Sequence, residues 1–207
     1  MLRPIAVSVL AVVLVLTLGS CSGKEKMRDK APPDVDRKLS YFAFIEEGDI
    51  ASLIVSTKAA RYRDGSGFLP LEITIANRGL RQLTLTRESF TLIDEGGNRY
   101  PAASPRELLE GYEFLDFDRK NFAELESIVF NRFGAFRKYP AKFSPTQSAI
   151  PGADNIVRDL VSLPKFGYLI DWIYFPEPPG GIKGHRFELF MDARELEDPI
   201  FIRFRVE

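Results

Sequence analysis

The chain has 207 residues, a formal net charge of −1 and a single cysteine. A near-neutral chain lacks the basic excess that nucleic-acid binding requires, so we expect no nucleic-acid partner. One cysteine forms neither an internal disulfide nor a cysteine-based zinc site, so core packing must stabilise the fold.

The N-terminus has the order of a secretory signal. Apolar and small residues run from Ile5 to Leu18 and are followed by Gly19, Ser20 and Cys21. A membrane-spanning helix needs roughly 20 apolar residues, and this run is shorter and precedes a charged stretch. We therefore expect a signal peptide over residues 1–20 and regard a transmembrane anchor as the weaker interpretation.

The sequence Leu18-Gly19-Ser20-Cys21 resembles the lipobox of bacterial lipoproteins. The resemblance implies cleavage between Ser20 and Cys21 and lipid attachment to Cys21, which would anchor the protein to a membrane. Ser22, where Asp would cause retention, implies the periplasmic face of the outer membrane in a diderm bacterium. An ordinary cleaved signal with an incidental cysteine is the alternative, and the sequence does not say whether the host has an outer membrane.

Residues 21–38 are rich in Lys, Glu, Asp and Pro and contain few apolar side chains. Such a composition buries too little surface to order itself, so it predicts a flexible tether. The domain is then expected over residues 39–207.

Alternation of apolar and polar residues predicts a series of short strands in the first half of this domain. The expected strands are 53–59, 69–75, 82–86, 90–92 and 99–100. Turn residues follow at 77–79 and 94–98, which is typical of antiparallel hairpins.

A helical insertion is expected over about 104–145. Ser104-Pro105-Arg106-Glu107 has the pattern of a capping box, and Gly111 is expected to end this first helix. A longer helix is expected from Asp118 to Pro140, because apolar residues recur at steps of three and four. These residues are Phe122, Leu125, Val129, Phe133 and Phe136.

Strand patterns return at 156–163, 168–175, 187–191 and 200–206, and the second of these is apolar on both faces apart from Asp171. Short strands without a βαβ rhythm favour a mainly β fold, an antiparallel β-sandwich with an α-helical insertion. The sheet order is not predicted.

Three segments resemble the telokin-like, immunoglobulin-like domains of bacterial lipoproteins of unknown function. They are 68–79, 90–101 and 171–176, and they contain an apolar strand ending in Asn-x-Gly and a second strand ending in Asp and Gly. The resemblance implies an immunoglobulin-like sandwich. It carries no catalytic residues, and the helical insertion departs from the family pattern.

His185 is the only histidine, and no Gly-x-Ser-x-Gly motif identifies a serine partner for it. A hydrolase site built from His185 and nearby carboxylates is therefore the alternative hypothesis, and we assign no catalytic residue.

Two clusters of acidic residues are considered as possible functional sites. Glu46, Glu47 and Asp49 are interpreted as a solvated cluster, because no spacing sets the separation that glycoside hydrolysis needs. The segment 94–98 offers oxygen ligands without EF-hand spacing, so a hairpin is favoured over calcium. We expect no metal and no cofactor.

The helical insertion contains more aromatic residues than one helical face can bury. Phe130 falls off the apolar stripe, so Phe130, Phe136 and Arg132 are candidate partner-binding residues; packing of both helix sides is the alternative. The loop 176–185 is a second candidate surface. The sequence thus predicts a lipid-anchored binding or scaffolding module of the cell envelope without catalytic activity, with a protein or glycan partner.

Overall fold

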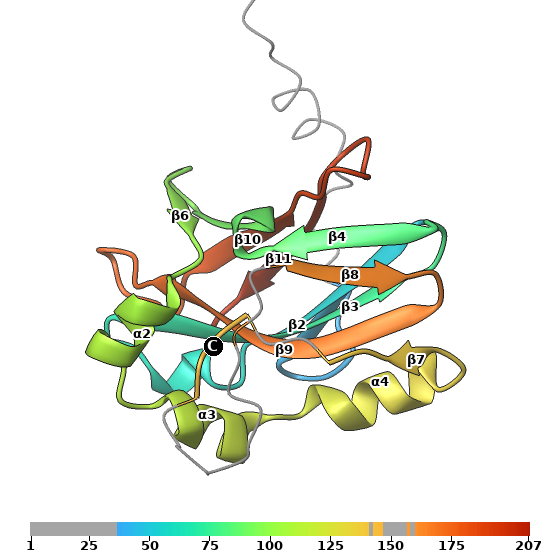
Figure 1. Ribbon diagram of the computed structural model, residues 1–207. Helices are drawn as coiled ribbons and strands as arrows, with labels where there is room; N and C mark the ends of the chain where they lie inside the picture. Colours follow the sequence, from blue (N-terminus) through green and yellow to red (C-terminus); the bar gives the residue numbers. More distant parts are fainter. Residues whose placement is uncertain (1–36, 141–142, 147–156, 158–159) are drawn as a thin grey trace, which may run out of the picture. The chain divides into compact units, whose positions relative to one another are not determined.

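The computed structural model describes residues 37–140, 143–146, 157 and 160–207 (Figure 1). Ser20, Cys21 and most of the predicted tether lie outside the described residues. Within the described ranges, no helix is both long enough and apolar enough to cross a membrane. The fold is mainly β, as the sequence predicts.

A five-stranded sheet with the order β1-β2-β3-β9-β7 forms one layer. Its strands are β1 (Ala43–Glu47), β2 (Ala51–Ser56), β3 (Phe68–Asn77), β9 (Gly167–Pro176) and β7 (Arg137–Lys138). The central strands β3 and β9 pair antiparallel over their full length, from Phe68 opposite Pro176 to Asn77 opposite Gly167. Only the short β7 pairs in parallel among these strands.

Two smaller sheets form the opposite layer. One has the order β11-β10-β5-β6 and contains β5 (Phe90–Asp94), β6 (Arg99–Pro101), β10 (Arg186–Met191) and β11 (Ile200–Arg205). The other pairs β4 (Gln82–Thr86) with β8 (Leu160–Pro164). All these pairs are antiparallel.

The main core lies between these layers. Alternate side chains of β3 point into it, and Leu69, Leu71, Ile73 and Ile75 are fully buried. This is the pattern that a period of two imposes on a strand whose one face meets a second sheet.

Three helices cover the outer face of the five-stranded sheet: α2 (Pro105–Gly111), α3 (Leu115–Phe122) and α4 (Leu125–Phe133) (Figure 1). They bury two further apolar clusters, so β9 is covered on both faces. In the cluster under α4, Leu125, Val129 and Phe133 pack against Ile54 and other sheet residues. The other cluster joins α2 and α3 to Trp172 and Tyr174 of β9 and is centred on Leu108, Tyr112 and Leu115.

The predicted single helix from Asp118 to Pro140 is wrong. The helical segment breaks at Ala123, which has φ −59° and ψ 128°, and α4 ends at Phe133. The buried carboxylate of Glu72 on β3 accepts hydrogen bonds from the backbone N–H groups of Glu124 and Leu125, at 2.8 and 3.1 Å. The free backbone N–H groups at the start of α4 are thus paired by a residue distant in sequence. Local periodicity does not reveal such a partner.

The predicted capping box of α2 is confirmed. The Glu107 backbone N–H donates to Ser104 Oγ at 3.2 Å, and the Ser104 N–H donates to the Glu107 carboxylate at 2.7 Å. By contrast, β1 was not predicted. Its residues Ala43, Phe44 and Ile45 are all buried, because α4 covers the face that an ordinary edge strand exposes to solvent.

Candidate functional site

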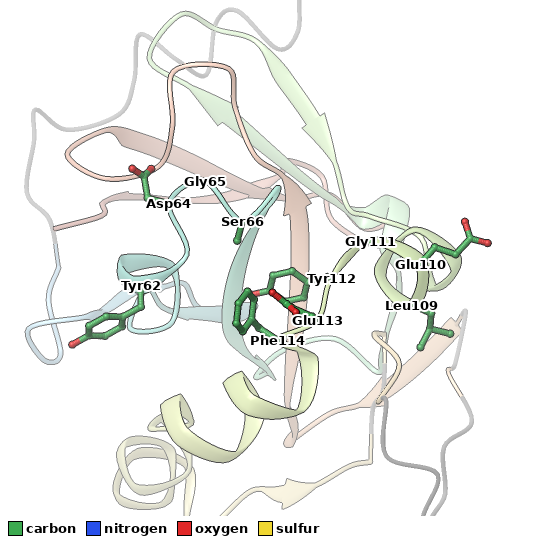
Figure 2. A pocket seen from close by; sticks show the side chains of 10 residues that line it. All are labelled: Tyr62, Asp64, Gly65, Ser66, Leu109, Glu110, Gly111, Tyr112, Glu113 and Phe114. Carbon is green, nitrogen blue, oxygen red and sulfur yellow. The ribbon is translucent and has the colours of Figure 1, made fainter.

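An open depression of about 610 Å³ lies between the loop after β2 and the end of α2 (Figure 2). Two short segments line it: Tyr62, Asp64, Gly65 and Ser66 on one side, and residues 109–114 on the other. The first segment begins at the last residue of η1 (Ala60–Tyr62), and the second begins in the last turn of α2. Because both segments are attached to the sheet and its covering helices, the depression has fixed walls.

The loop 176–185 fixes one wall of the depression. Oδ1 of Asp64 accepts hydrogen bonds from the backbone N–H groups of Ile182 and Lys183, at 2.7 and 3.2 Å. In the other direction, the Glu177 carboxylate accepts from the backbone N–H groups of Gly65 and Gly67, at 2.7 and 2.8 Å. The hydrogen bonds from Ile182 and Lys183 lower the pKa of Asp64. A proline-rich loop that the sequence marked as a recognition candidate therefore supports the depression.

A buried ionic network lies beneath the depression. The guanidinium of Arg63 donates to Oδ1 of Asp118 from Nε at 2.9 Å and from Nη2 at 2.6 Å. The hydroxyl of Tyr112 donates to Oδ2 of Asp118 at 2.5 Å. Burial raises the pKa of Asp118, and the hydrogen bonds from Tyr112 and Arg63 oppose that rise. Burial and the Asp118 hydrogen bond also raise the pKa of Tyr112, so its hydroxyl stays a donor.

Aromatic rings surround Arg63 and extend to the rim. The guanidinium carbon lies 4.1 Å from the ring centroid of Phe114 and 5.4 Å from that of Phe122. Tyr62 stacks on Phe122 with centroids 5.0 Å apart and an interplanar angle of 7°, yet the Tyr62 side chain remains 55% exposed. Leu109 on the opposite side is 52% exposed. The depression thus offers solvent an aromatic ring and an aliphatic side chain on rigid supports.

Acidic side chains dominate the charge of the lining. Asp64, Glu110 and Glu113 line the depression, and none of its ten lining residues is basic. Glu110 forms a surface ion pair with Arg106 at 2.8 Å, which contributes little to stability. Carboxylates beside exposed aromatic rings attract cationic groups, because the ring face and the carboxylate both favour positive charge.

His185 lies at the end of the loop 176–185 and is exposed. Its backbone N–H donates to the carbonyl of Ile182. Among the residues that the structure describes, no hydrogen bond joins the imidazole to a serine hydroxyl or a carboxylate. The described part of the chain therefore shows no hydrogen-bonded nucleophile and base around His185, and the hydrolase stays an alternative hypothesis.

Two of the other carboxylates considered from the sequence, Glu47 and Asp94, have structural contacts. Glu47 pairs with Arg78 at 2.6 Å and also with Arg132, and both contacts lower the pKa of Glu47. Asp94 accepts hydrogen bonds from Asn98 and Tyr100 within the β5–β6 hairpin, which fits a turn. In the described ranges, no cluster of three or more metal-ligating side chains occurs.

The predicted partner-binding residues do not line the depression. Phe130 on α4 is 71% exposed, as its position off the apolar stripe predicts. Phe136 is half-buried beside Phe133 and Phe166, with ring centroids 5.3 and 5.4 Å away. Arg132 is engaged by Glu47. Binding by these three residues stays a prediction.

Sequence reasoning missed the lining residues Tyr62 and Leu109. For Leu109 the sequence offered one signal, the capping box, because the start of α2 sets the face of the helix on which Leu109 lies. Tyr62 carried no comparable signal, because its exposure depends on the stack with Phe122, sixty residues away in sequence.

The fold and the depression define a class of protein: an antiparallel β-sandwich with helices on one face and an acidic, aromatic depression at its surface. No protein-family model matches the sequence, and no curated protein gives a significant match. Among solved structures, the chain is similar to a putative lipoprotein, YcdA from Bacillus subtilis subsp. subtilis str. 168, with a TM-score of 0.41 and 14% sequence identity. The similarity covers 78% of this chain and 38% of that chain. A likeness at this level assigns no function.

Proposed function

We propose that the protein is a lipid-anchored binding module of the cell envelope that holds a partner in the depression without chemical turnover. The observation that carries this proposal is the combination of exposed Tyr62 and Leu109 with acidic side chains in a depression that has one wall held by hydrogen bonds. A prebuilt concave surface with a few placed polar groups is typical of binding sites. The anchor rests on the sequence around Cys21.

The lining favours a protein or glycan partner that presents a positively charged group. Such a group would lie near the Glu113 carboxylate, and Leu109 would contact the apolar part of the partner. The Tyr62 ring already stacks on Phe122 and has the Arg61 guanidinium carbon 5.7 Å from its centroid, so it would add an apolar contact. An exposed ion pair with Glu113 contributes at most about 1 kcal/mol. Several contacts of this size are needed for stable binding, which agrees with a partner larger than a single ion.

Two finer assignments belong to the same proposal. The sandwich is of the telokin-like, immunoglobulin-like type, supported by the strands β3 and β5 and the turns that follow them. The protein resides on the periplasmic face of an outer membrane, supported by Ser22 after the lipidation site. Phe130 on α4 provides a second, smaller contact surface.

The anchor is tested by mass spectrometry of the protein extracted from membranes. We expect a mature N-terminus at Cys21 that carries diacylglycerol and, as a rule for such lipoproteins, an additional acyl chain. A chain that keeps residue 1, or an unmodified Cys21, would contradict the anchor.

The binding site is tested by placing a photoreactive amino acid at position 109 in the producing cells. A matched control carries it at position 160, because Leu160 on β8 is 56% exposed but lies outside the depression. We expect a crosslinked partner from position 109 that is lost in a Glu113→Lys background, since reversed charge repels a cationic group. Equal products from both positions, or a product unaffected by Glu113→Lys, would contradict the proposed site.

A further inference from the structure

Four turns meet at one end of the sandwich: 48–50, 78–81, 164–166 and 134–136. The backbone N–H of Phe166 donates to the carbonyl of Asn77 at 2.8 Å, and that of Arg137 donates to the carbonyl of Phe166 at 2.9 Å. The N–H of Arg78 donates to the carbonyl of Ile50 at 2.9 Å. We call this surface the loop end; the turns after β3, before β9 and after α4 lie together in Figure 1.

Apolar side chains project from the loop end. Phe166 is 54% exposed and Ile50 is 44% exposed. The half-buried Phe136 lies under Phe166, with ring centroids 5.4 Å apart in an edge-to-face arrangement. These residues come from three separate turns, so the apolar surface is a product of the tertiary fold.

Phe166 has a backbone conformation that its side chain does not favour. Its φ is 59°, the left-handed region that glycine and asparagine adopt readily and that costs a bulky residue roughly 1 kcal/mol or more. An exposed phenyl ring repays little of this cost through packing. Strain of this kind clusters at functional surfaces.

Basic side chains flank these apolar residues. Arg81, Arg137 and Lys165 are exposed, and none forms an ion pair with another described residue. The Lys165 ammonium lies 5.2 Å from the Phe166 ring centroid. The nearby acid Glu47 is neutralised by Arg78 and Arg132, which leaves Asp49 as the exposed acid of the β1–β2 turn. Positive charge therefore prevails around Phe166.

We propose that the loop end docks on the surface of an anionic lipid bilayer, with Phe166 and Ile50 at headgroup depth and Arg81, Arg137 and Lys165 facing lipid phosphates. Aromatic rings prefer the membrane–water interface, and basic residues near anionic lipid add to the attraction. The inference rests on the proposed anchor, because a lipid on Cys21 confines the domain near a bilayer. The chain from Cys21 to residue 37 spans at most about 55 Å, so the anchor keeps residue 37 within that distance of the membrane.

The test is sedimentation with vesicles of the chain from residue 21 onward, with Cys21→Ser so that no lipid is attached. We expect it to bind vesicles of phosphatidylcholine mixed with phosphatidylglycerol, to bind pure phosphatidylcholine much more weakly, and to be released by salt. Phe166→Asn should weaken binding about tenfold. The membrane is expected to bury about half of the phenyl ring, and the substitution removes the contribution of that buried half. Arg137→Gln with Lys165→Gln should weaken it about 25-fold, at about fivefold for each base.

Two controls keep the result interpretable. Asn suits the left-handed backbone of residue 166, so Phe166→Asn should fold normally, as thermal unfolding will verify. Leu160→Asn removes an equally exposed apolar side chain elsewhere and should bind vesicles like the parent chain.

Several outcomes would overturn the proposal: no binding to the anionic vesicles, equal binding to both lipid compositions, or binding insensitive to Phe166→Asn. A protein crosslinked through position 166 in cells, without vesicle binding, would make the loop end a protein interface and would equally overturn it. Mass spectrometry of Cys21 remains independent of this assay, so failure of the loop end and failure of the anchor are distinguishable.

Discussion

At the scale of single residues, Glu72 is a carboxylate buried in the middle of a sheet. It lies on the central strand β3 and is 3% exposed, and burial raises its pKa from 4.5 to about 7. The N–H groups of Glu124 and Leu125 oppose this rise, and the nearby Glu124 carboxylate adds to it. Glu72, which accepts hydrogen bonds at the start of α4, is therefore costly to ionise.

The raised pKa predicts how stability depends on pH. The folded protein holds the Glu72 proton up to about pH 7, whereas an unfolded glutamate releases it near 4.5. The free energy of unfolding must therefore fall as pH rises through this window, by up to roughly 3 kcal/mol from this group. Glu72→Gln should flatten the dependence, as measured by urea unfolding between pH 4.5 and 8.

Glu113→Gln serves as the control for loss of one carboxylate, because Glu113 is exposed. If Glu72→Gln and Glu113→Gln change the pH dependence equally, the account of Glu72 is wrong.

The network of Arg63, Asp118 and Tyr112 supplies a second prediction. Asp118→Asn leaves the buried Arg63 charge without its counter-ion, so we expect a loss of about 3 to 5 kcal/mol in unfolding free energy. Tyr112→Phe removes one hydrogen bond and should cost about 1 to 3 kcal/mol. Glu110→Gln, which breaks an exposed pair, should change stability by less than about 1 kcal/mol. Chemical denaturation checks the order, and equal losses in all three variants would refute it.

At the scale of elements, helix starts show what can be read locally. The α2 start was predicted because both partners of its capping box lie within four residues, Ser104 and Glu107. The α4 start was missed because its acceptor, Glu72, lies on another element. A local motif is visible in sequence, whereas a cap supplied by the sheet is not.

The capping box gives the prediction at this scale. Ser104→Ala removes the acceptor for the Glu107 N–H and should destabilise the protein by about 1 kcal/mol. Because α2 carries Leu109, we also expect weaker crosslinking from position 109. Ser104→Asp, which keeps a capping oxygen, should restore both stability and crosslinking. If the Asp variant is no better than the Ala variant, the cap does not act through this hydrogen bond.

At the scale of the whole molecule, β3 and β9 lie at the centre, between the second layer of strands and the helices. Both are ten-residue strands with almost every residue buried, because the second layer covers one face and the helices cover the other. Strands buried in this way open only when the molecule unfolds globally, whereas short strands open locally.

Amide hydrogen exchange measured by mass spectrometry tests this hierarchy. We expect the slowest exchange in β3 and β9 and much faster exchange in β6 and β7, which contain three and two residues. Uniform protection across all strands would contradict the central role of the β3–β9 pair.

The sequence by itself determined the strands β3, β5 and β9, the α2 capping box and the mainly β class, because alternation and capping are set by neighbouring residues. It also predicts the lipid attachment at Cys21 through a local motif. Only the tertiary structure decided that α3 and α4 are separate, that β4 pairs with β8, and that Tyr62, Leu109 and Phe166 are exposed. Each of these depends on contacts between residues far apart in the chain, such as Glu72 with Leu125 and Tyr62 with Phe122, and periodicity carries no information about such contacts.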